Sequence, residues 1–188
     1  MKKGKIIAVS APSGGGKTSV VKQVLRDFPE IVFSVSVTTR PKRKNEVDGV
    51  DYFFVDDKEF ERRIENNEFI EWERFYDYYY GTLKSFVDDN ISAGKSVLFE
   101  VDVKGALSLK KIYPDSHLIY IDPPSFEELV KRLKNRKTES EDDLQKRIDR
   151  AKMELSYKPQ FDYIFVNDEL NKVYKNVKSL IKEILSKE

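Results

Sequence analysis

Short apolar segments alternate with amphipathic segments along most of the chain. Four runs are mainly apolar, namely residues 6–9, 97–101, 118–121 and 163–166. Such runs are expected of strands that are buried on both faces of a sheet. The first run is followed by Val20, Val21 and Val24 at helical spacing. Segments with apolar residues at helical spacing also follow the other three runs. This alternation predicts an α/β fold in which helices flank a parallel sheet.

Local signals mark where several of these helices begin and end. Pro29 closes the helix that starts near Lys17. Ser125 with Glu128 forms a capping box, and Ser140 opens a further helix. These signals place helices between the apolar runs, and a long amphipathic helix follows the last run.

Residues 31–83 have a different pattern, which mixes strands with a short helix. We expect strands at 31–37 and 51–55, with a basic, proline-containing loop between them. Asp56 with Glu59 begins the helix, and an aromatic stretch follows it. The pattern predicts a small mixed α/β insert between the first helix and the second apolar run.

The composition narrows the kinds of site that the chain can hold. Its 188 residues include 34 Lys and Arg against 33 Asp and Glu, a balance unlike that of nucleic-acid or membrane-surface binders. Cysteine is absent and His117 is the single histidine, which argues against zinc sites and Ser-His-Asp triads. No apolar run reaches the roughly 18 residues of a membrane span. We expect a soluble cytoplasmic protein without nucleic-acid or membrane partners, whose oligomeric state stays undecided.

Residues 11–18, APSGGGKT, match the phosphate-binding loop pattern G-x-x-x-x-G-K-[ST], except that Ala11 replaces its first glycine. The loop joins a predicted strand to a predicted helix, so backbone N–H groups and the helix dipole point at one anion. The alternative to a phosphate-binding loop is a glycine-rich surface turn, which would not need a buried strand before it and a helix after it. Lys17 adds a charge for the β- and γ-phosphates, and the Thr18 hydroxyl can ligate Mg²⁺. The predicted ATP-binding residues here are Ala11, Pro12, Ser13, Gly14, Gly15, Gly16, Lys17 and Thr18.

Two carboxylates stand at the end of the second apolar run. Glu100 and Asp102 are two residues apart, so a strand would point them to the same face. One or both could hold Mg²⁺ through water, or accept a hydrogen bond from a substrate. A pair of solvated carboxylates is the alternative, and the phosphate loop argues against it.

A basic loop in the insert offers a second place for a phosphate. Arg40 and Arg43 flank a proline turn and present forked donors that suit a dianionic phosphate. Tyr52 and Tyr80 can add phenolic hydroxyls. Taken alone, however, two arginines in a basic loop are more often a solvated surface.

Longer motifs resemble those of the guanylate kinase family. Residues 38–55 read TTRPKRKNEVDGVDYFFV, and SVSVTTR, FIEW, YYYGT, APSGGGKT and VDVKGA also stand in the family's order. The resemblance covers essentially the whole chain and implies a P-loop kinase core with a parallel sheet. It implies one domain with three parts: a core (1–34, 84–124 and 151–188), a GMP-binding insert (35–83) and a helical lid (125–150).

The resemblance also implies which residues bind the acceptor nucleotide. Guanine presents N–H donors at N1 and N2 and an acceptor at O6, so carboxylates and hydroxyls together would select it. By resemblance, Glu71 and Asp102 supply the carboxylates, while Ser36 and Thr82 supply the hydroxyls. The full set implied for GMP is Ser36, Arg40, Arg43, Tyr52, Glu71, Tyr80, Thr82 and Asp102.

By the same resemblance, Arg132, Arg136 and Arg147 belong to a lid that closes over ATP. Together with Lys17 they would be the catalytic residues that act on the transferring phosphoryl group. Asn167 would lie near adenine. Lys137 stands where the family usually has glycine, which puts the hinge of the lid in question.

The reaction implied is the transfer of a phosphoryl group from ATP to GMP, and also to dGMP, with Mg²⁺. The acceptor phosphate has a second pKa of about 6 and is largely dianionic at neutral pH, so no general base is needed. One alternative is a non-catalytic guanylate-kinase-like module that binds protein partners, although such a module would be expected to lose parts of the ATP loop. Another is a kinase for a different nucleoside monophosphate, against which Glu71, Ser36 and Asp102 argue.

Overall fold

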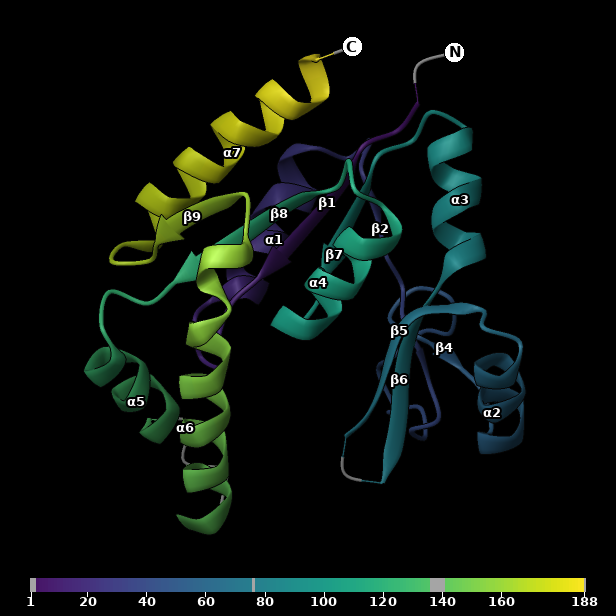
Figure 1. The fold of residues 1–188 in the computed structure, drawn as a ribbon, viewed down its shortest axis with the longest axis horizontal. Coiled ribbons are helices and arrows are strands. Elements are labelled where there is room, and N and C mark those ends of the chain that lie inside the picture. The colour runs from purple at the N-terminus through teal and green to yellow at the C-terminus, as the bar shows by residue number, and fades with distance from the viewer. Residues whose placement is uncertain (1–2, 76, 136–140, 188) are drawn as a thin grey trace.

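The computed structural model describes residues 3–75, 77–135 and 141–187, which form two sheets surrounded by helices (Figure 1). The larger sheet has five strands in the order β2-β7-β1-β8-β9, and all its pairings are parallel. Its strands are β1 (Ile6–Ser10), β2 (Val32–Phe33), β7 (Val97–Glu100), β8 (His117–Asp122) and β9 (Tyr163–Val166). The predicted α/β fold with a parallel sheet flanked by helices is confirmed.

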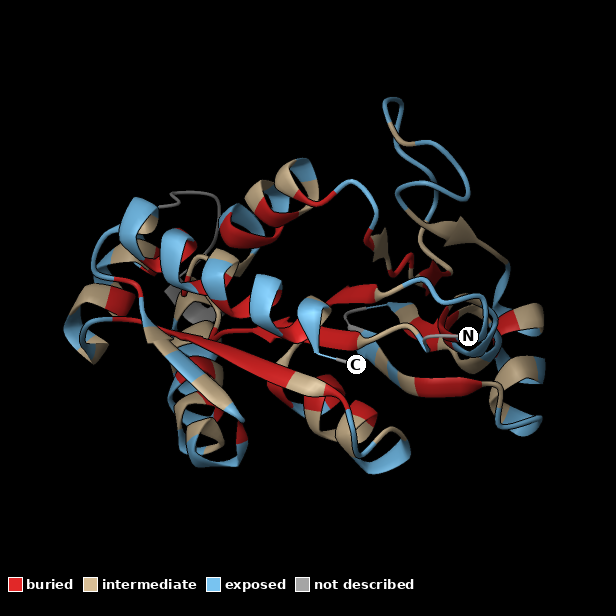
Figure 2. Ribbon diagram, turned by 90° about the horizontal axis from the view of Figure 1, so that it is seen from above, coloured by how far each residue is buried: buried red, intermediate tan, exposed pale blue. Residues whose placement is uncertain are grey.

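Helices cover both faces of the larger sheet. Successive side chains of its central strand β1 therefore pack against helices on opposite faces. Ile7 and Val9 pack on the face covered by helices α1 (Lys17–Asp27) and α7 (Leu170–Ser186). Ile6 and Ala8 pack on the opposite face, under α3 (Lys84–Ser92) and α4 (Val103–Ile112). Figure 2 shows the buried strands between helices whose outer sides are exposed. The loop after β1 therefore leaves the middle of a sheet that is fixed from both sides.

The second sheet has four strands in the order β4-β3-β6-β5. Its strands are β3 (Val37–Thr38), β4 (Phe53–Phe54), β5 (Phe69–Phe75) and β6 (Tyr78–Leu83), and helix α2 (Asp57–Glu65) packs beside them. Only β3 and β4 pair in parallel. Phe60 of α2 is fully buried and stacks on Phe69 at 4.4 Å and on Tyr79 at 5.1 Å between ring centroids. This small core is separate from the two clusters of the larger sheet.

The expected single strand over residues 31–37 is wrong. The chain leaves the larger sheet after Phe33 and enters the second sheet at Val37, so the expected strand is split between two sheets. The apolar pattern hides this change because Ser34 and Val35 in the link are themselves buried. Of the strand expected over residues 51–55, only Phe53 and Phe54 form a strand, β4.

Two helices follow β8, namely α5 (Phe126–Lys134) and α6 (Glu141–Ser156), and a short 3-10 helix, η1 (Lys158–Gln160), precedes β9. The Ser125 hydroxyl accepts a hydrogen bond from the Glu128 N–H at 3.2 Å, as the capping box predicts. Ser140 lies outside the described residues. In Figure 1, α6 and the second sheet extend below the larger sheet on opposite sides. Within the described ranges, no helix combines the length and the apolar character that a membrane span requires.

Candidate active site

A cavity of about 570 Å³ opens between the loop after β1, the end of β7, the second sheet and α6. The predicted residues that line it are Ala11, Pro12, Ser13, Gly14, Gly15, Gly16, Lys17, Thr18, Ser36, Tyr52, Glu71, Tyr80, Glu100, Asp102 and Arg147. The predicted residues outside its lining are Arg40, Arg43, Thr82, Arg132 and Asn167. Arg136 and Lys137 lie outside the described residues. The cavity therefore joins most of the predicted donor and acceptor sites.

The loop over residues 11–18 has the backbone shape of an anion cradle. Gly14 and Gly16 have φ angles of 85° and 96°, a region that side chains with a Cβ rarely enter. Gly16 is the N-cap residue of α1, and no described side chain caps this helix end. The first N–H groups of α1 and the positive end of its dipole are thus left for a bound anion.

Ala11 is tolerated in place of the first glycine of the pattern. Among the described residues, Asn67 is the only non-glycine residue with a positive φ, so Ala11 adopts a conformation open to alanine. Its methyl group instead restricts Gly15, where an added Cβ would lie 2.8 Å from the Ala11 Cβ. The Ala11 methyl group and Pro12 together leave room only for glycine at position 15.

Two residues from the predicted site support the loop from outside the cavity. The Asn167 side-chain amide is buried and donates to the Gly15 carbonyl at 2.9 Å. Arg132 on α5 donates through Nη2 to the Asn167 carbonyl at 3.1 Å and through Nε to Glu128 at 3.1 Å. Their predicted contacts with ATP stay predictions, and what the geometry establishes is a link from α5 and β9 to the loop.

Oxygen donors suitable for Mg²⁺ meet beside the loop. The Thr18 hydroxyl donates to Glu100 Oε1 at 2.5 Å, and Lys17 Nζ lies 3.8 Å from the same oxygen. A hydroxyl and one carboxylate fit a cation that takes its remaining ligands from phosphates and water. The described residues hold no cluster of three or more His, Cys, Asp or Glu side chains that could bind a metal without such help.

Asp102 faces a different group from Glu100. Strand β7 ends at Glu100, so strand alternation does not extend to Asp102, which is the N-cap of α4 and accepts from the Gly105 N–H at 2.7 Å. Its other oxygen accepts from Arg150 at 2.9 Å. These contacts favour Glu100 as the carboxylate nearer to a metal, and a metal role for Asp102 stays a prediction.

Three of the four residues predicted to hold the acceptor phosphate, Arg40, Tyr52 and Tyr80, lie together. The Arg40 guanidinium lies 5.4 Å from the centre of the Tyr52 ring, and the Tyr52 and Tyr80 rings are 6.1 Å apart. Arg40 Nη2 donates to Glu46 Oε1 at 2.7 Å, and this hydrogen bond is the main cause that raises the pKa of Arg40. The Arg43 N–H donates to the other Glu46 oxygen at 2.8 Å, and its side chain is exposed. A phosphate that binds Arg40 would compete with Glu46. The sequence analysis did not identify Glu46 as part of the site.

The predicted guanine side is a group of carboxylates at the edge of the second sheet. Thr82 lies opposite Glu71 in the β5–β6 ladder, and its hydroxyl donates to Glu71 Oε1 at 2.8 Å. Burial is the main cause that raises the pKa of Glu71 to about 7; the Thr82 hydrogen bond opposes this, and Asp102 and Glu73 add to it. An added Cβ at Gly105 would lie 3.2 Å from Asp102 Oδ1 and 3.5 Å from Glu71 Cδ, so the two carboxylates are near neighbours.

Four charged residues that sequence reasoning missed also line the cavity: Glu73, Lys146, Arg150 and Glu154. Glu73 follows Glu71 by two residues, so strand alternation could have placed both on one face. Arg150 follows Arg147 by three residues, a helical spacing that could have placed both on one side of α6. Glu154 gave no signal of its own.

Comparisons with known proteins agree over nearly the whole chain. A family model described as guanylate kinase matches residues 3–184. The guanylate kinase of Thermotoga maritima is 47% identical over 180 residues, covering 96% of this chain and 87% of that protein. The guanylate kinase of Chlorobaculum tepidum is 48% identical over 183 residues, covering 97% and 94%.

A solved structure gives the same result from the fold. The crystal structure of guanylate kinase from Anaplasma phagocytophilum superposes with a TM-score of 0.76 at 31% identity and covers 100% of this chain and 89% of that one. The resemblance inferred from the motifs is therefore confirmed. Motifs, fold and relatives together show that the chain belongs to the guanylate kinase family.

Proposed function

We propose that this chain transfers the γ-phosphoryl group of ATP to GMP, and to dGMP, giving ADP and GDP or dGDP. Membership of the guanylate kinase family supports the reaction, the donor and the acceptor. The observation that carries the proposal is a shared cavity, because the phosphate loop and Glu71 line the same space. Two polyanions can therefore meet end to end inside it.

The donor side of the reaction is assigned to the loop over residues 11–18. Its backbone N–H groups would hold the β- and γ-phosphates, and Lys17 would neutralise charge as the phosphoryl group moves. Arg147 lines the cavity on α6 and is positioned to add a second positive charge. The roles of Arg132 and Arg136 in transfer, and of Asn167 at adenine, belong to the same proposal.

The acceptor side is assigned to the second sheet and its loops. Arg40, Arg43, Tyr52 and Tyr80 would hold the phosphate of GMP, and this grip sets the direction of the attacking oxygen. Glu71 and Asp102 would accept hydrogen bonds from guanine N1 and N2, with the Ser36 and Thr82 hydroxyls beside them. Adenine offers no matching pair of donors, so the same carboxylates would exclude it.

The chemistry at the centre needs no general base from the protein. An oxygen of the GMP phosphate forms a bond to the γ-phosphorus while the bond from that phosphorus to the bridging oxygen of ADP breaks. Thr18 and Glu100 would hold Mg²⁺, which would supply positive charge for the phosphates of ATP. The protein groups bind and orient both nucleotides and exclude water, since water would otherwise accept the phosphoryl group.

The division into core (1–34, 84–124 and 151–188), insert (35–83) and lid (125–150) is part of this proposal. We infer that insert and lid close on the core when both nucleotides are bound, because hydrolysis of ATP must be avoided. The cytoplasmic location, the absence of nucleic-acid and membrane partners and the oligomeric state stay predictions or open points.

A substrate panel tests the proposal. Turnover of ATP is measured in a coupled assay with GMP, dGMP, AMP, UMP and TMP as acceptors, with and without Mg²⁺. We expect turnover with GMP and dGMP that depends on Mg²⁺, and at least about a hundredfold lower efficiency with AMP. Preference for another base would overturn the acceptor assignment. Absence of turnover with every acceptor would favour a non-catalytic binding module.

A further inference from the structure

Arg150 lines the cavity but has no part in the roles assigned above. It lies on α6, three residues after Arg147, and makes contacts with both walls of the cavity. Its Nη2 donates to Asp102 Oδ2 at 2.9 Å and to Glu73 Oε2 at 3.4 Å. Its Nε donates to Glu154 Oε1 at 3.0 Å. One guanidinium therefore connects α6 to the guanine side of the cavity.

Arg150 is itself held in place by Glu154. The Glu154 residue is only 3% exposed, and its second oxygen, Oε2, accepts from the Ser13 N–H of the phosphate loop at 2.8 Å. A buried carboxylate fixed to the loop backbone is a rigid partner for the arginine. The direction of the Arg150 side chain is thus set before any nucleotide binds.

The Asp102 carboxylate is held from two sides. Oδ1 accepts from the Gly105 N–H at the start of α4, and Oδ2 accepts from Arg150. An ionised carboxylate has about four acceptor positions, so these two contacts leave places for N–H donors of a base. Fixing the carboxylate in advance lowers the entropy that ligand binding has to remove.

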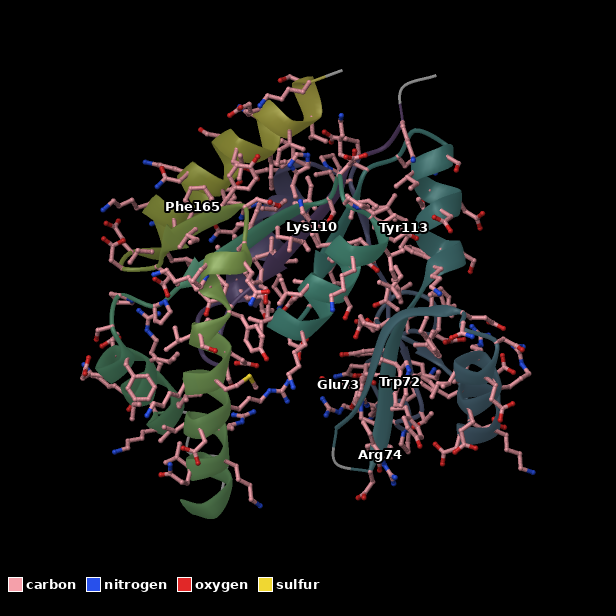
Figure 3. The ribbon with its side chains drawn as sticks, viewed as in Figure 1. Trp72, Glu73, Arg74, Lys110, Tyr113 and Phe165 are labelled. Atoms are coloured by element: carbon pink, nitrogen blue, oxygen red, sulfur yellow. The ribbon has the colours of Figure 1, made fainter. Side chains whose placement is uncertain are left out.

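Arg150 also balances a local excess of negative charge. Glu71, Glu73 and Asp102 face the same part of the cavity, and Figure 3 shows Glu73 on β5, the strand that carries Glu71. Burial and the neighbouring Asp102 raise the pKa of Glu73, and Arg150 opposes that rise. Arg150 forms ion pairs with both Glu73 and Asp102 and so offsets part of this negative charge.

We propose that Arg150, anchored by Glu154, is a positioning residue that sets the Asp102 carboxylate for the base of the acceptor nucleotide. The proposal deepens the proposed function and rests on it, since it takes guanine as that base. Arg150 acts through Asp102 and contacts neither reacting phosphate. Its removal is therefore expected to weaken GMP binding more than it slows phosphoryl transfer.

The first test is Arg150→Met, which removes the charge and the forked donors but keeps a long apolar side chain. We expect the Kd of GMP, measured by calorimetry without ATP, and the KM for GMP to rise about tenfold, the effect of losing one charged hydrogen bond. The KM for ATP and kcat should change by less than about threefold. Lys152→Met, which removes a charge from an exposed position two residues along α6, serves as the matched control and should leave all four values unchanged.

The second test separates positioning from a general structural effect. In an Asp102→Asn background, Arg150→Met should raise the Kd of GMP by less than about twofold, because the group it acts through is already altered. Arg150→Lys keeps the charge but has a single ammonium group in place of the forked donors, so its Kd of GMP should lie between those of wild type and Arg150→Met. If the methionine variant folds poorly, the lysine variant provides the same comparison.

Two results would overturn the proposal: an unchanged Kd of GMP in both Arg150 variants, or the full tenfold loss in the Asp102→Asn background. A failure of the proposed function would look different, because the wild-type protein itself would then show no preference for GMP.

Discussion

The donor and acceptor sides of the cavity are built in different ways. The donor side is a contiguous loop, residues 11–18, whose shape comes from glycine backbone angles and whose donors are mainly backbone N–H groups. The acceptor side is assembled from side chains of several elements, and these already form pairs such as Arg40 with Glu46 and Asp102 with Arg150. On the donor side, the N–H groups at the start of α1 are open to an anion, while Lys17 and Thr18 contact Glu100. On the acceptor side, a phosphate would have to displace Glu46 from Arg40, whereas Asp102 can keep Arg150 and still accept from a base.

The two sides also rest on different cores. The loop follows β1, every residue of which is buried between helices on both faces of the larger sheet. The acceptor residues depend on the small cluster around Phe60, Phe69 and Val37. Since a small core supplies little stability, the acceptor side should be the easier one to lose.

The largest expected effect is on the donor side. Lys17→Ala should lower kcat about a thousandfold or more, because a charge that acts on the moving phosphoryl group is removed. Steady-state kinetics with GMP and ATP measure this effect, and circular dichroism checks that the fold is kept. Lys22→Ala, at an exposed position on the same helix, should leave kcat unchanged. Normal turnover of Lys17→Ala would show that the donor assignment is wrong.

The next largest effect should come from a substitution that destabilises the small core of the second sheet but not the core of the larger sheet. Phe60→Ala removes a fully buried ring and should cost about 3–5 kcal/mol within the acceptor side. GMP binding should be lost while a non-hydrolysable ATP analogue still binds, as measured by calorimetry. Leu109→Ala, in the core of the larger sheet, should weaken both. Equal loss of both ligands in Phe60→Ala would mean that the two regions unfold as one.

Base recognition should respond to a single carboxylate. Glu71→Gln replaces one acceptor oxygen by a donor and should lower kcat/KM for GMP about a hundredfold, with a smaller change for AMP. Competing acceptors in the coupled assay give the ratio directly. Glu61→Gln, an exposed change in the same part of the chain, is the control. If the ratio of GMP to AMP stayed at its wild-type value, Glu71 would not read the base.

The smallest effect is a dependence on pH that belongs to the acceptor side alone. Glu71 must be ionised to accept from guanine, and its pKa is raised to about 7, so the Kd of GMP should rise up to about tenfold per pH unit below 7. The GMP phosphate titrates near pH 6 as well, and Glu71→Gln keeps that contribution while removing the other. Binding of the ATP analogue should lack the step near pH 7. An identical pH profile in wild type and Glu71→Gln would contradict the assignment.

The same pKa has a consequence for stability, with a definite sign. Folding favours protonated Glu71, since its pKa rises from 4.5 to about 7 in the folded protein. This contribution to the free energy of unfolding is fully present below about pH 4.5 and is lost as the pH rises through 7. Denaturant unfolding without ligand should therefore show a loss of stability over this range that Glu71→Gln lacks.

The two sides of the cavity also differ in how well the sequence alone predicted them. The phosphate loop was predictable because its pattern is contiguous and each residue type has a local reason, down to the tolerated Ala11. The strands β1, β7 and β8 were predictable because burial on both faces leaves continuous apolar runs. Strand β9 was predictable from its apolar run, although Ile164 and Val166 are exposed. The change of sheet between Phe33 and Val37 was not predictable, since a buried link looks like a strand.

The acceptor residues were accessible mainly through the family resemblance. Arg40 and Arg43 alone looked like a solvated surface, and Glu46, which pairs with Arg40, carried no signal. Arg150 meets Glu73 and Asp102 from positions 77 and 48 residues away in the chain. Contacts of that separation depend on how the two sheets and α6 are placed, which no local pattern records.

The most direct test is a crystal structure with GMP and a non-hydrolysable ATP analogue bound together. We predict that the triphosphate lies in the loop over residues 11–18, that guanine lies against Glu71 and Asp102, and that the GMP phosphate lies at Arg40 and Arg43. The two phosphate ends should then face each other across the cavity. Guanine bound away from Glu71, or a GMP phosphate away from Arg40, would contradict this arrangement.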